Sequence, residues 1–418
     1  MLVFFISAGS LLFSYGVFLP IMSDGLGWSR AYVGAGLSLA LLIFAFFSPL
    51  IGASIIKFGP RANIILGNFV AALGMFGMSQ CSELWHLYFF FGVLVGLGTG
   101  FGQYLACTTL INNWFMAKKS LSMGFLLASA GLAGFVFPPL TAWLIASVGW
   151  QTTWIVLGGI NITFAVLIGG FVLIRNRPEE LGQVPYGKIV ETGSSFGVET
   201  LINKNIDVKF TDWHIKQAIR EPALWLIILV GATNYYAFGV TSAHQIAYLK
   251  DIGFSVIVAA LLSSLVSGMS VIGRFGFGVL ALRINIRKLI ITSFILQVCA
   301  FIILSTTENP VLIYLYAVFF GVSCGAIIVA IPTIVGEYFG RANYAQIMGF
   351  VLLMCVGSQS TGPVIAGIIY ETTTTYTLAF ILMTCVSLLG LTCAILLRRP
   401  KPLNNPSNNM STEYLGFD

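Results

Sequence analysis

The chain alternates between long apolar runs and short polar interruptions. A helix needs about 20 mostly apolar residues to cross the hydrocarbon core of a bilayer. Twelve runs meet that length: 1–22, 31–56, 62–82, 86–112, 119–147 and 152–174, then 222–249, 257–282, 288–306, 310–338, 343–370 and 376–397. The pattern predicts an all-α membrane protein with twelve transmembrane helices.

The polar stretches divide these runs into two sets of six. One stretch separates the sixth run from the seventh, and another follows the twelfth. We therefore predict an N-terminal six-helix bundle over 1–174 and a C-terminal six-helix bundle over 221–397. A cytoplasmic central loop over 175–220 joins them, and a cytoplasmic tail covers 398–418.

The composition indicates a membrane protein and argues against a soluble, nucleic-acid-binding or metal-binding protein. Of 418 residues, 57% are hydrophobic and only 9% are charged, whereas soluble domains carry about 25% charged residues. The net charge of +6 is not gathered into a basic run interleaved with aromatics, so nucleic acid is not expected as a partner. The seven cysteines stand singly in apolar runs, which indicates packing rather than metal binding.

The basic residues predict the orientation. One set of loops carries nearly all of them: Lys57, Arg61, Lys118, Lys119, Arg283, Arg287, Lys288, Arg341, Arg398, Arg399, Lys401 and those of the central stretch. The opposite loops hold Arg30 and Lys250. The positive-inside rule places the central loop and both termini in the cytoplasm, in a cell (inner) membrane.

The two halves repeat one another in register. Gly52, Lys57 and Arg61 follow the second run at the spacing with which Gly278, Arg283 and Arg287 follow the eighth. Met123-Gly124-Phe125 and Pro139 likewise correspond to Met348-Gly349-Phe350 and Pro363. Repeated halves of this kind place a substrate near the middle of the membrane, at the seam between them.

Four segments carry a family resemblance. They are Asp24-Gly25-Leu26-Gly27-Trp28-Ser29-Arg30, the stretch from Trp114-Phe115 to Ala128-Ser129-Ala130-Gly131, Arg177-Pro178-Glu179-Glu180-Leu181-Gly182, and Gly273-Arg274-Phe275-Gly276-Phe277-Gly278. The chain resembles the major facilitator superfamily. Within it, the nearest likeness is to the monocarboxylate transporter branch, including its bacterial members and the neighbouring oxalate/formate antiporters. The resemblance implies two pseudo-symmetric bundles, alternating access, function as a monomer, and no cofactor.

Some positions depart from the family pattern. Ile56 and Leu282 stand where the superfamily usually has an acidic residue in the loop after the second and eighth helices. Ser270 stands where proton-coupled animal members have an aspartate, and the first run has no Lys or Arg in place of the family's lysine.

Arg274 is the main candidate for substrate binding. No other charged residue occurs between Phe254 and Leu282. A charge buried in a membrane segment is costly and tends to serve function, and a guanidinium matches a carboxylate in a bidentate manner. The alternative is that Arg274 snorkels to the interface or caps backbone carbonyls. The resemblance also places the family's substrate arginine in this segment.

The expected substrate is a monoanion. No Lys or Arg occurs between Tyr344 and Leu397, so the eleventh helix lacks the second cation of oxalate-carrying relatives. Lactate, pyruvate, formate and acids of acetate size are therefore favoured.

His244 is a candidate for proton coupling. Its imidazole titrates near neutral pH, and it matches a histidine common in bacterial relatives. A neutral, hydrogen-bonded histidine in the interior or at the interface is an equal alternative.

Further polar residues complete the candidate site. The helices that the resemblance assigns to the cavity, with two neighbours, offer Tyr15, Gln103, Tyr104, Thr108, Asn234, Tyr235, Tyr236, Ser270, Gln359 and Ser360. Glu337 and Arg341 bracket the end of the tenth run and are predicted to form an ion pair at the inner gate.

Carriage of a small monocarboxylate, with a proton or in exchange, is the predicted function. An oxalate/formate-type dicarboxylate antiporter and a non-transporting receptor of the same fold remain as alternatives. An enzyme is not expected, because the three histidines are far apart and the runs hold no acidic cluster or metal ligand set.

Overall fold

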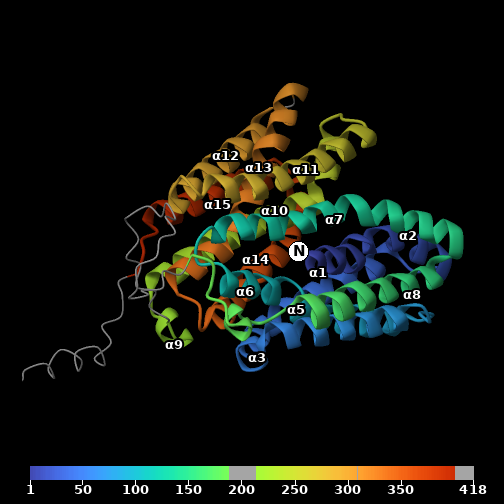
Figure 1. Ribbon diagram of the computed structural model, residues 1–418. Coiled ribbons are helices and arrows are strands. Elements are labelled where there is room, and N and C mark those ends of the chain that lie inside the picture. Colours follow the sequence, from blue (N-terminus) through green and yellow to red (C-terminus); the bar gives the residue numbers. More distant parts are fainter. Residues whose placement is uncertain (188–212, 308, 401–418) are drawn as a thin grey trace, which may run out of the picture.

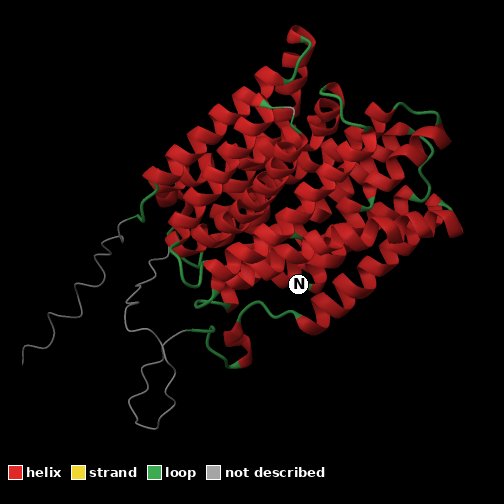
Figure 2. Ribbon diagram, turned by 90° about the horizontal axis from the view of Figure 1, so that it is seen from above, coloured by secondary structure: helices red, strands yellow, loops and turns green. Residues whose placement is uncertain are grey.

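The computed structural model describes residues 1–187, 213–307 and 309–400, and helices dominate these ranges (Figure 2). The N-terminal half contains α1 (Leu2–Ser7), η1 (Ala8–Phe13), α2 (Tyr15–Leu26), α3 (Arg30–Met78), α4 (Leu84–His86), η2 (Leu87–Val95), α5 (Gly96–Gly102), α6 (Tyr104–Trp114), α7 (Lys119–Val148), α8 (Trp150–Ile160) and η3 (Asn161–Leu173). Between the halves lie η4 (Pro178–Leu181) and α9 (Ile215–Ala218). The C-terminal half contains α10 (Pro222–Asp251), α11 (Val256–Leu280), α12 (Ile286–Thr306), α13 (Pro310–Tyr338), α14 (Tyr344–Thr373) and α15 (Thr377–Leu396).

Eleven helices in these ranges are long and apolar enough to cross a membrane, and one of them contains two predicted spans. That helix covers Tyr32–Met78, 47 residues. At 1.5 Å per residue it would be about 70 Å long, more than twice the hydrocarbon thickness. Gly59 interrupts it at φ 81° and ψ 157°, just before Pro60. A positive φ suits glycine, and proline cannot donate the helical hydrogen bond, so the chain turns here between the second and third spans. Of the predicted central loop and tail, 188–212 and 401–418 lie outside the described residues.

The fourth span, Leu84–Trp114, is broken at Gln103. Gln103 leaves the helical conformation at φ −114° and ψ −103°, and α5 ends before it while α6 begins after it. π-Helical turns also occur in the first, fourth and sixth spans, as η1, η2 and η3. Irregular backbone within a membrane span is tolerated where protein surrounds it.

The helices form two bundles that lie side by side (Figure 1). The elements from α1 to α8 form one bundle, and those from α10 to α15 form the other. The bundles meet mainly where α7 packs on α11 and α3 packs on α14, and α13 and α14 also contact α6 or α7. The bundles converge at the end near α9 and diverge toward the other end (Figure 1).

Small residues allow the helices within a bundle to approach closely. A Cβ added to Gly98 would lie 2.6 Å from the backbone nitrogen of Ala71, and one added to Gly67 would collide with the backbone of Gly102. The third and fourth spans therefore touch backbone to backbone, as small-residue spacing permits in membranes.

The seam between the bundles is closed at one end, which we call the central-segment face because residues 175–187 and 213–221 lie there. A Cβ on Gly278 would lie 3.0 Å from the carbonyl oxygen of Ser120 in α7. One on Gly52 would overlap the carbonyl of Ala345. Nearby, Lys119 Nζ donates to the carbonyl of Gly336, 3.2 Å away. At the opposite end, α2 packs on η1, α3 and α7 of its own bundle.

Candidate substrate site

Arg274 lies at the seam, six residues before the end of α11 at Leu280. Its Nη1 donates to the carbonyl of Leu127 in α7, 3.0 Å away, so the side chain crosses between the bundles. Its Nε is buried and has no hydrogen-bond partner among the described residues. The guanidinium lies close enough to Cys324, Tyr235 and Tyr104 to interact with them electrostatically. These neighbours belong to α13, α10 and α6, so four helices besides α11 surround the charge.

Two tyrosines from opposite bundles meet beside this arginine. The hydroxyls of Tyr104 in α6 and Tyr235 in α10 lie close enough to interact electrostatically. The Tyr104 hydroxyl also lies 3.5 Å from the carbonyl oxygen of Ile328 in α13. A hydroxyl can both donate and accept, so this pair can bind a carboxylate oxygen next to the guanidinium.

Two buried amides near the seam carry atoms without partners. The side chain of Asn234 is fully buried, and neither its Oδ1 nor its Nδ2 has a partner among the described residues. It lies next to Cys324, which itself interacts with Arg274. Gln103, at the break in the fourth span, is buried and has an unpartnered Nε2. Because unsatisfied buried polar groups are costly, these atoms are suited to a polar ligand.

Cys324 was not predicted as a site residue. The sequence shows it only as one small residue in Ser323-Cys324-Gly325, which matches a packing role. The carbonyl of Ser270 collides with a Cβ placed on Gly325, so α11 and α13 are in backbone contact here. That contact brings Cys324 next to Arg274, and the neighbouring glycine was the one signal for it.

Other predicted residues have their polar groups engaged within one bundle. Tyr15 is fully buried, donates its hydroxyl to the carbonyl of Val33 at 2.5 Å, and stacks on Phe91. Thr108 donates to the carbonyl of Tyr104 at 2.9 Å, one turn from the tyrosine pair. Ser360 donates to the carbonyl of Val356 at 3.1 Å.

The remaining predicted residues lie on helix contacts. Tyr236, next to Tyr235, packs against Gly362 of α14. The carbonyl of Gln359 touches Gly239 of α10, and Ser270 is buried against α13. The structure therefore brings Arg274, Tyr104, Tyr235 and Asn234 together near Cys324, and the other predicted residues contact their own or neighbouring helices.

His244 lies outside this group, toward the face opposite the central segment. Its Nε2 is 2.9 Å from the carbonyl oxygen of Pro363, and its Nδ1 is 3.2 Å from the Tyr376 hydroxyl. A carbonyl only accepts, so Nε2 carries the hydrogen, and Nδ1 of the neutral ring accepts from Tyr376. His244 follows Tyr235 by nine residues in one helix, which corresponds to about 14 Å along the axis.

The predicted ion pair between Glu337 and Arg341 is wrong. Arg341 instead pairs with Glu179 of η4, with Nη1 3.0 Å from Oε1 and Nη2 3.3 Å from Oε2. The reason is local: α13 ends at Tyr338, and Gly340 at φ 84° turns the chain before Arg341. Glu337 and Arg341 therefore do not follow one helical face, and Glu337 interacts with Lys119 and Arg399.

Charges shift the pKa of Glu179 below its ordinary value. Its slight burial alone would raise the pKa, but the hydrogen bonds from Arg341 and from its own backbone, with the charges of Arg341 and Arg177, outweigh that effect. The Arg341–Glu179 pair thus joins the start of the central segment to the C-terminal bundle in the ionised form.

Comparisons with known proteins agree with this geometry. The Major Facilitator Superfamily model matches residues 1–358 and 250–414. Monocarboxylate transporter 13 of Bos taurus is 26% identical over 384 residues, 91% of this chain and 83% of that protein. An uncharacterised MFS-type transporter of Escherichia coli, YhjX, is 25% identical over 82% of this chain and 80% of its own length.

Solved structures show the same fold. The MFS transporter FucP superposes with a TM-score of 0.72 at 14% identity, over 95% of this chain and 97% of that one. The proton:xylose symporter XylE superposes with a TM-score of 0.72 at 11% identity, over 96% of both chains. The resemblance found in the sequence is confirmed by the family match and by the monocarboxylate transporter relatives. This chain belongs to the major facilitator superfamily and is a multi-pass membrane transporter rather than an enzyme.

Proposed function

We propose that the transporter carries a small monocarboxylate by alternating access and binds its carboxylate at Arg274. The observation that carries this proposal is the position of the guanidinium. It lies at the seam, interacts with residues of both bundles, and keeps an unpartnered buried Nε. An anion bound there would supply the missing acceptor and neutralise the charge.

The surroundings favour a substrate with one negative charge. The side chains gathered at Arg274 are two hydroxyls, an amide and a thiol, and the described part of α14 carries no Lys or Arg. Hydroxyl and amide groups can orient the remaining oxygens of lactate, pyruvate or formate. A dianion such as oxalate would meet only one countercharge. Removing water from its second carboxylate would therefore cost free energy that no cation offsets.

Transport then requires the seam to open at the central-segment face, which the basic loops predict to be cytoplasmic. The closed face and the diverging opposite end correspond to a state that loads from outside. Opening would break the Lys119–Gly336 hydrogen bond and the Arg341–Glu179 pair.

His244 is the candidate proton acceptor, since its Nδ1 can take a proton if the Tyr376 hydroxyl reverses its hydrogen bond. Exchange of one carboxylate for another needs no such group.

The test is counterflow in proteoliposomes with a panel of lactate, pyruvate, formate, acetate and oxalate. We expect exchange of the monoanions, weak exchange of oxalate, and roughly 100-fold less exchange by Arg274→Ala. Arg283→Gln is the matched control, because Arg283 is an exposed cation in the turn after α11. Oxalate exchanged as well as lactate would favour the dicarboxylate antiporter, and a folded chain that exchanges none of these acids would contradict the proposal.

A further inference from the structure

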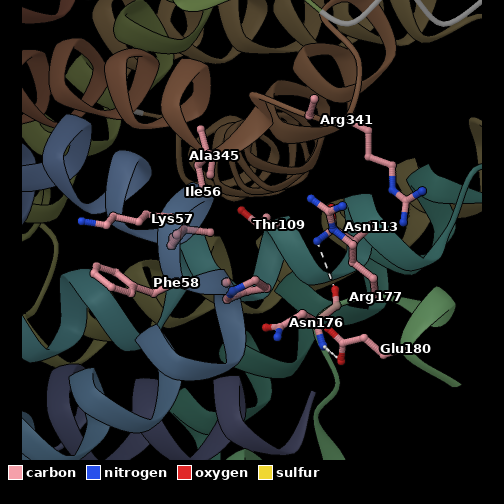
Figure 3. Close-up of a pocket in the computed structure, with 14 residues that line it drawn as sticks. Ile56, Lys57, Phe58, Thr109, Asn113, Asn176, Arg177, Glu180, Arg341 and Ala345 are labelled. Atoms are coloured by element: carbon pink, nitrogen blue, oxygen red, sulfur yellow. Dashed lines mark hydrogen bonds between the residues drawn. The ribbon is translucent and has the colours of Figure 1, made fainter.

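A second hollow lies far from Arg274, at the central-segment face (Figure 3). Its volume is about 350 Å³, within the usual range of small-molecule sites. It is lined by Ile55, Ile56, Lys57, Phe58, Gly59, Pro60, Thr109, Asn113, Asn176, Arg177, Glu180, Arg341, Ala342 and Ala345. The pocket thus takes its walls from the turn at Gly59, α6, the start of the central segment and the beginning of α14.

The charges of this pocket favour an anion. Three of its lining residues are cationic and one is a carboxylate. Glu179, outside the lining, neutralises Arg341, so one positive charge remains in excess. Figure 3 shows Arg341 reaching toward the pocket from the C-terminal bundle and Arg177 on the side of the N-terminal bundle. Lys57 lies at the edge, with its Nζ 5.1 Å from the centroid of the Phe58 ring.

Arg177 is the lining cation whose guanidinium donors make no hydrogen bond within the described residues, although its charge also acts on Glu179. Within residues 1–187, 213–307 and 309–400, no ion pair or side-chain hydrogen bond involves its guanidinium. By contrast, the neighbouring Arg175 donates to three backbone carbonyls, those of Phe171, Val172 and Ile174. Arg341 already binds Glu179. An incoming anion would therefore meet one guanidinium with all its donors available.

Neutral groups hold this part of the pocket in place. Asn176 accepts from the backbone nitrogen of Arg61 at 2.8 Å through its Oδ1, and its own carbonyl accepts from Asn113 Nδ2 at 3.1 Å. Its backbone nitrogen donates to Glu180 Oε2 at 3.2 Å. These bonds engage both carbonyl oxygens of Asn176 and fix the backbone next to Arg177, while no hydrogen bond within the described residues uses the Asn176 Nδ2 donor.

We propose that this pocket binds a phosphate monoester and that the bound ligand holds the central-segment face closed. A phosphate monoester carries nearly two negative charges at neutral pH and offers three acceptor oxygens, which the donors of Arg177 and the Asn176 Nδ2 can bind. Arginine binds such groups in a bidentate manner. Because the walls come from both bundles, an occupant would link them and oppose their separation. The ligand is either the headgroup of an anionic lipid or a soluble phosphate ester.

The experiment uses the full chain in phosphatidylcholine nanodiscs, with glycerol 3-phosphate as the soluble probe and phosphatidic acid as the lipid that carries the same group. Binding of the probe is measured by calorimetry, and stabilisation by phosphatidic acid is measured from the unfolding temperature. The variants are Arg177→Gln and, as the control outside the pocket, Arg283→Gln. Transport substrate is absent, so the result does not depend on monocarboxylate carriage.

We expect one of the two ligands to act on the wild type and on Arg283→Gln, and to act at least roughly tenfold more weakly on Arg177→Gln. Binding of glycerol 3-phosphate identifies a soluble ester as the occupant. Stabilisation by phosphatidic acid alone identifies the lipid headgroup. The proposal is overturned if neither ligand acts on the wild type, or if Arg177→Gln and Arg283→Gln respond alike.

Discussion

The middle of the seam and its closed end differ in how their cationic side chains are satisfied. In the middle, Arg274 Nε and both amide atoms of Asn234 are buried without partners. At the central-segment face, Lys119 donates to a carbonyl of the other bundle and Arg341 is paired with Glu179. Unsatisfied groups cost free energy unless a ligand completes them. The difference supports the proposal that the middle receives a ligand, whereas the contacts of the closed end join the two bundles.

The largest effect is expected at the middle. Arg274→Ala should lower counterflow of lactate by roughly 100-fold, because hydrogen bonds to a charged group contribute about 1.5–3 kcal/mol. Arg274→Lys keeps the charge and loses the planar fork, so it should fall between the wild type and Arg274→Ala. Unfolding temperatures of the purified variants check that the chain is folded. Equal activity of Arg274→Ala and the wild type would remove the distinction between the two regions.

The next effect concerns glycine contacts at the closed end. A Cβ on Gly278 would lie 3.0 Å from Ser120 O and 3.2 Å from Gly124 Cα, so Gly278→Leu should push α11 away from α7. Overpacking typically costs about 1–3 kcal/mol, which should shift the chain away from this closed state and slow transport by roughly 10- to 100-fold. Spin-label distances between the bundles measure the shift. Gly276→Leu is the matched control, because nothing lies within 4 Å of a Cβ at Gly276.

A smaller effect is expected at His244. A glutamine there can still donate to the Pro363 carbonyl but cannot take up a proton, so His244→Gln should flatten the pH dependence of lactate uptake. Uptake at neutral pH should fall by no more than about tenfold, since a neutral hydrogen bond contributes about 0.5–1.5 kcal/mol. Initial rates across a pH series provide the measurement. An unchanged pH profile would assign His244 a structural role.

The smallest effect is expected at the Arg341–Glu179 pair. Both side chains are partly exposed, 26% and 48%, and exposed pairs contribute about 0–1 kcal/mol. Glu179→Gln should therefore change the closed population by no more than about fivefold. The lowered pKa of Glu179 gives the sign of the pH effect: the attraction is complete above the ordinary value of 4.5 and is lost as the pH falls through the lower value in the folded chain.

Spin-label distances at pH 7 and under acid conditions would test this pair. The wild type should approach Glu179→Gln on acidification, whereas Glu179→Gln itself should respond less. A larger acid response in Glu179→Gln would show that another group controls this face.

The sequence was sufficient for much of the fold because lipid imposes a simple rule on each run. The apolar length predicted the helices, and the lone charge between Phe254 and Leu282 predicted a functional arginine in the eighth span. The break at Gly59 was also within reach, since Gly-Pro between two long runs is typical of a turn. These features depend on residues close together in the chain.

Contacts between distant residues could not be predicted in the same way. Glu179 and Arg341 are 162 positions apart, and the helical spacing of Glu337 suggested a nearer partner for Arg341. That prediction was wrong because the chain leaves the helical conformation at Gly340, before it reaches Arg341. Likewise, nothing local shows that Tyr15 gives its hydroxyl to Val33, or that Cys324 faces Arg274. Such partners follow from how helices rotate about their axes when they pack.

Equilibrium binding of radiolabelled lactate to the purified chain tests the central claim most directly, because it separates binding from movement of the bundles. We predict saturable binding to the wild type and to Arg283→Gln, and none to Arg274→Gln at the same lactate concentrations and with a matching unfolding temperature. Lactate bound equally well by folded Arg274→Gln would contradict the claim that this guanidinium holds the substrate.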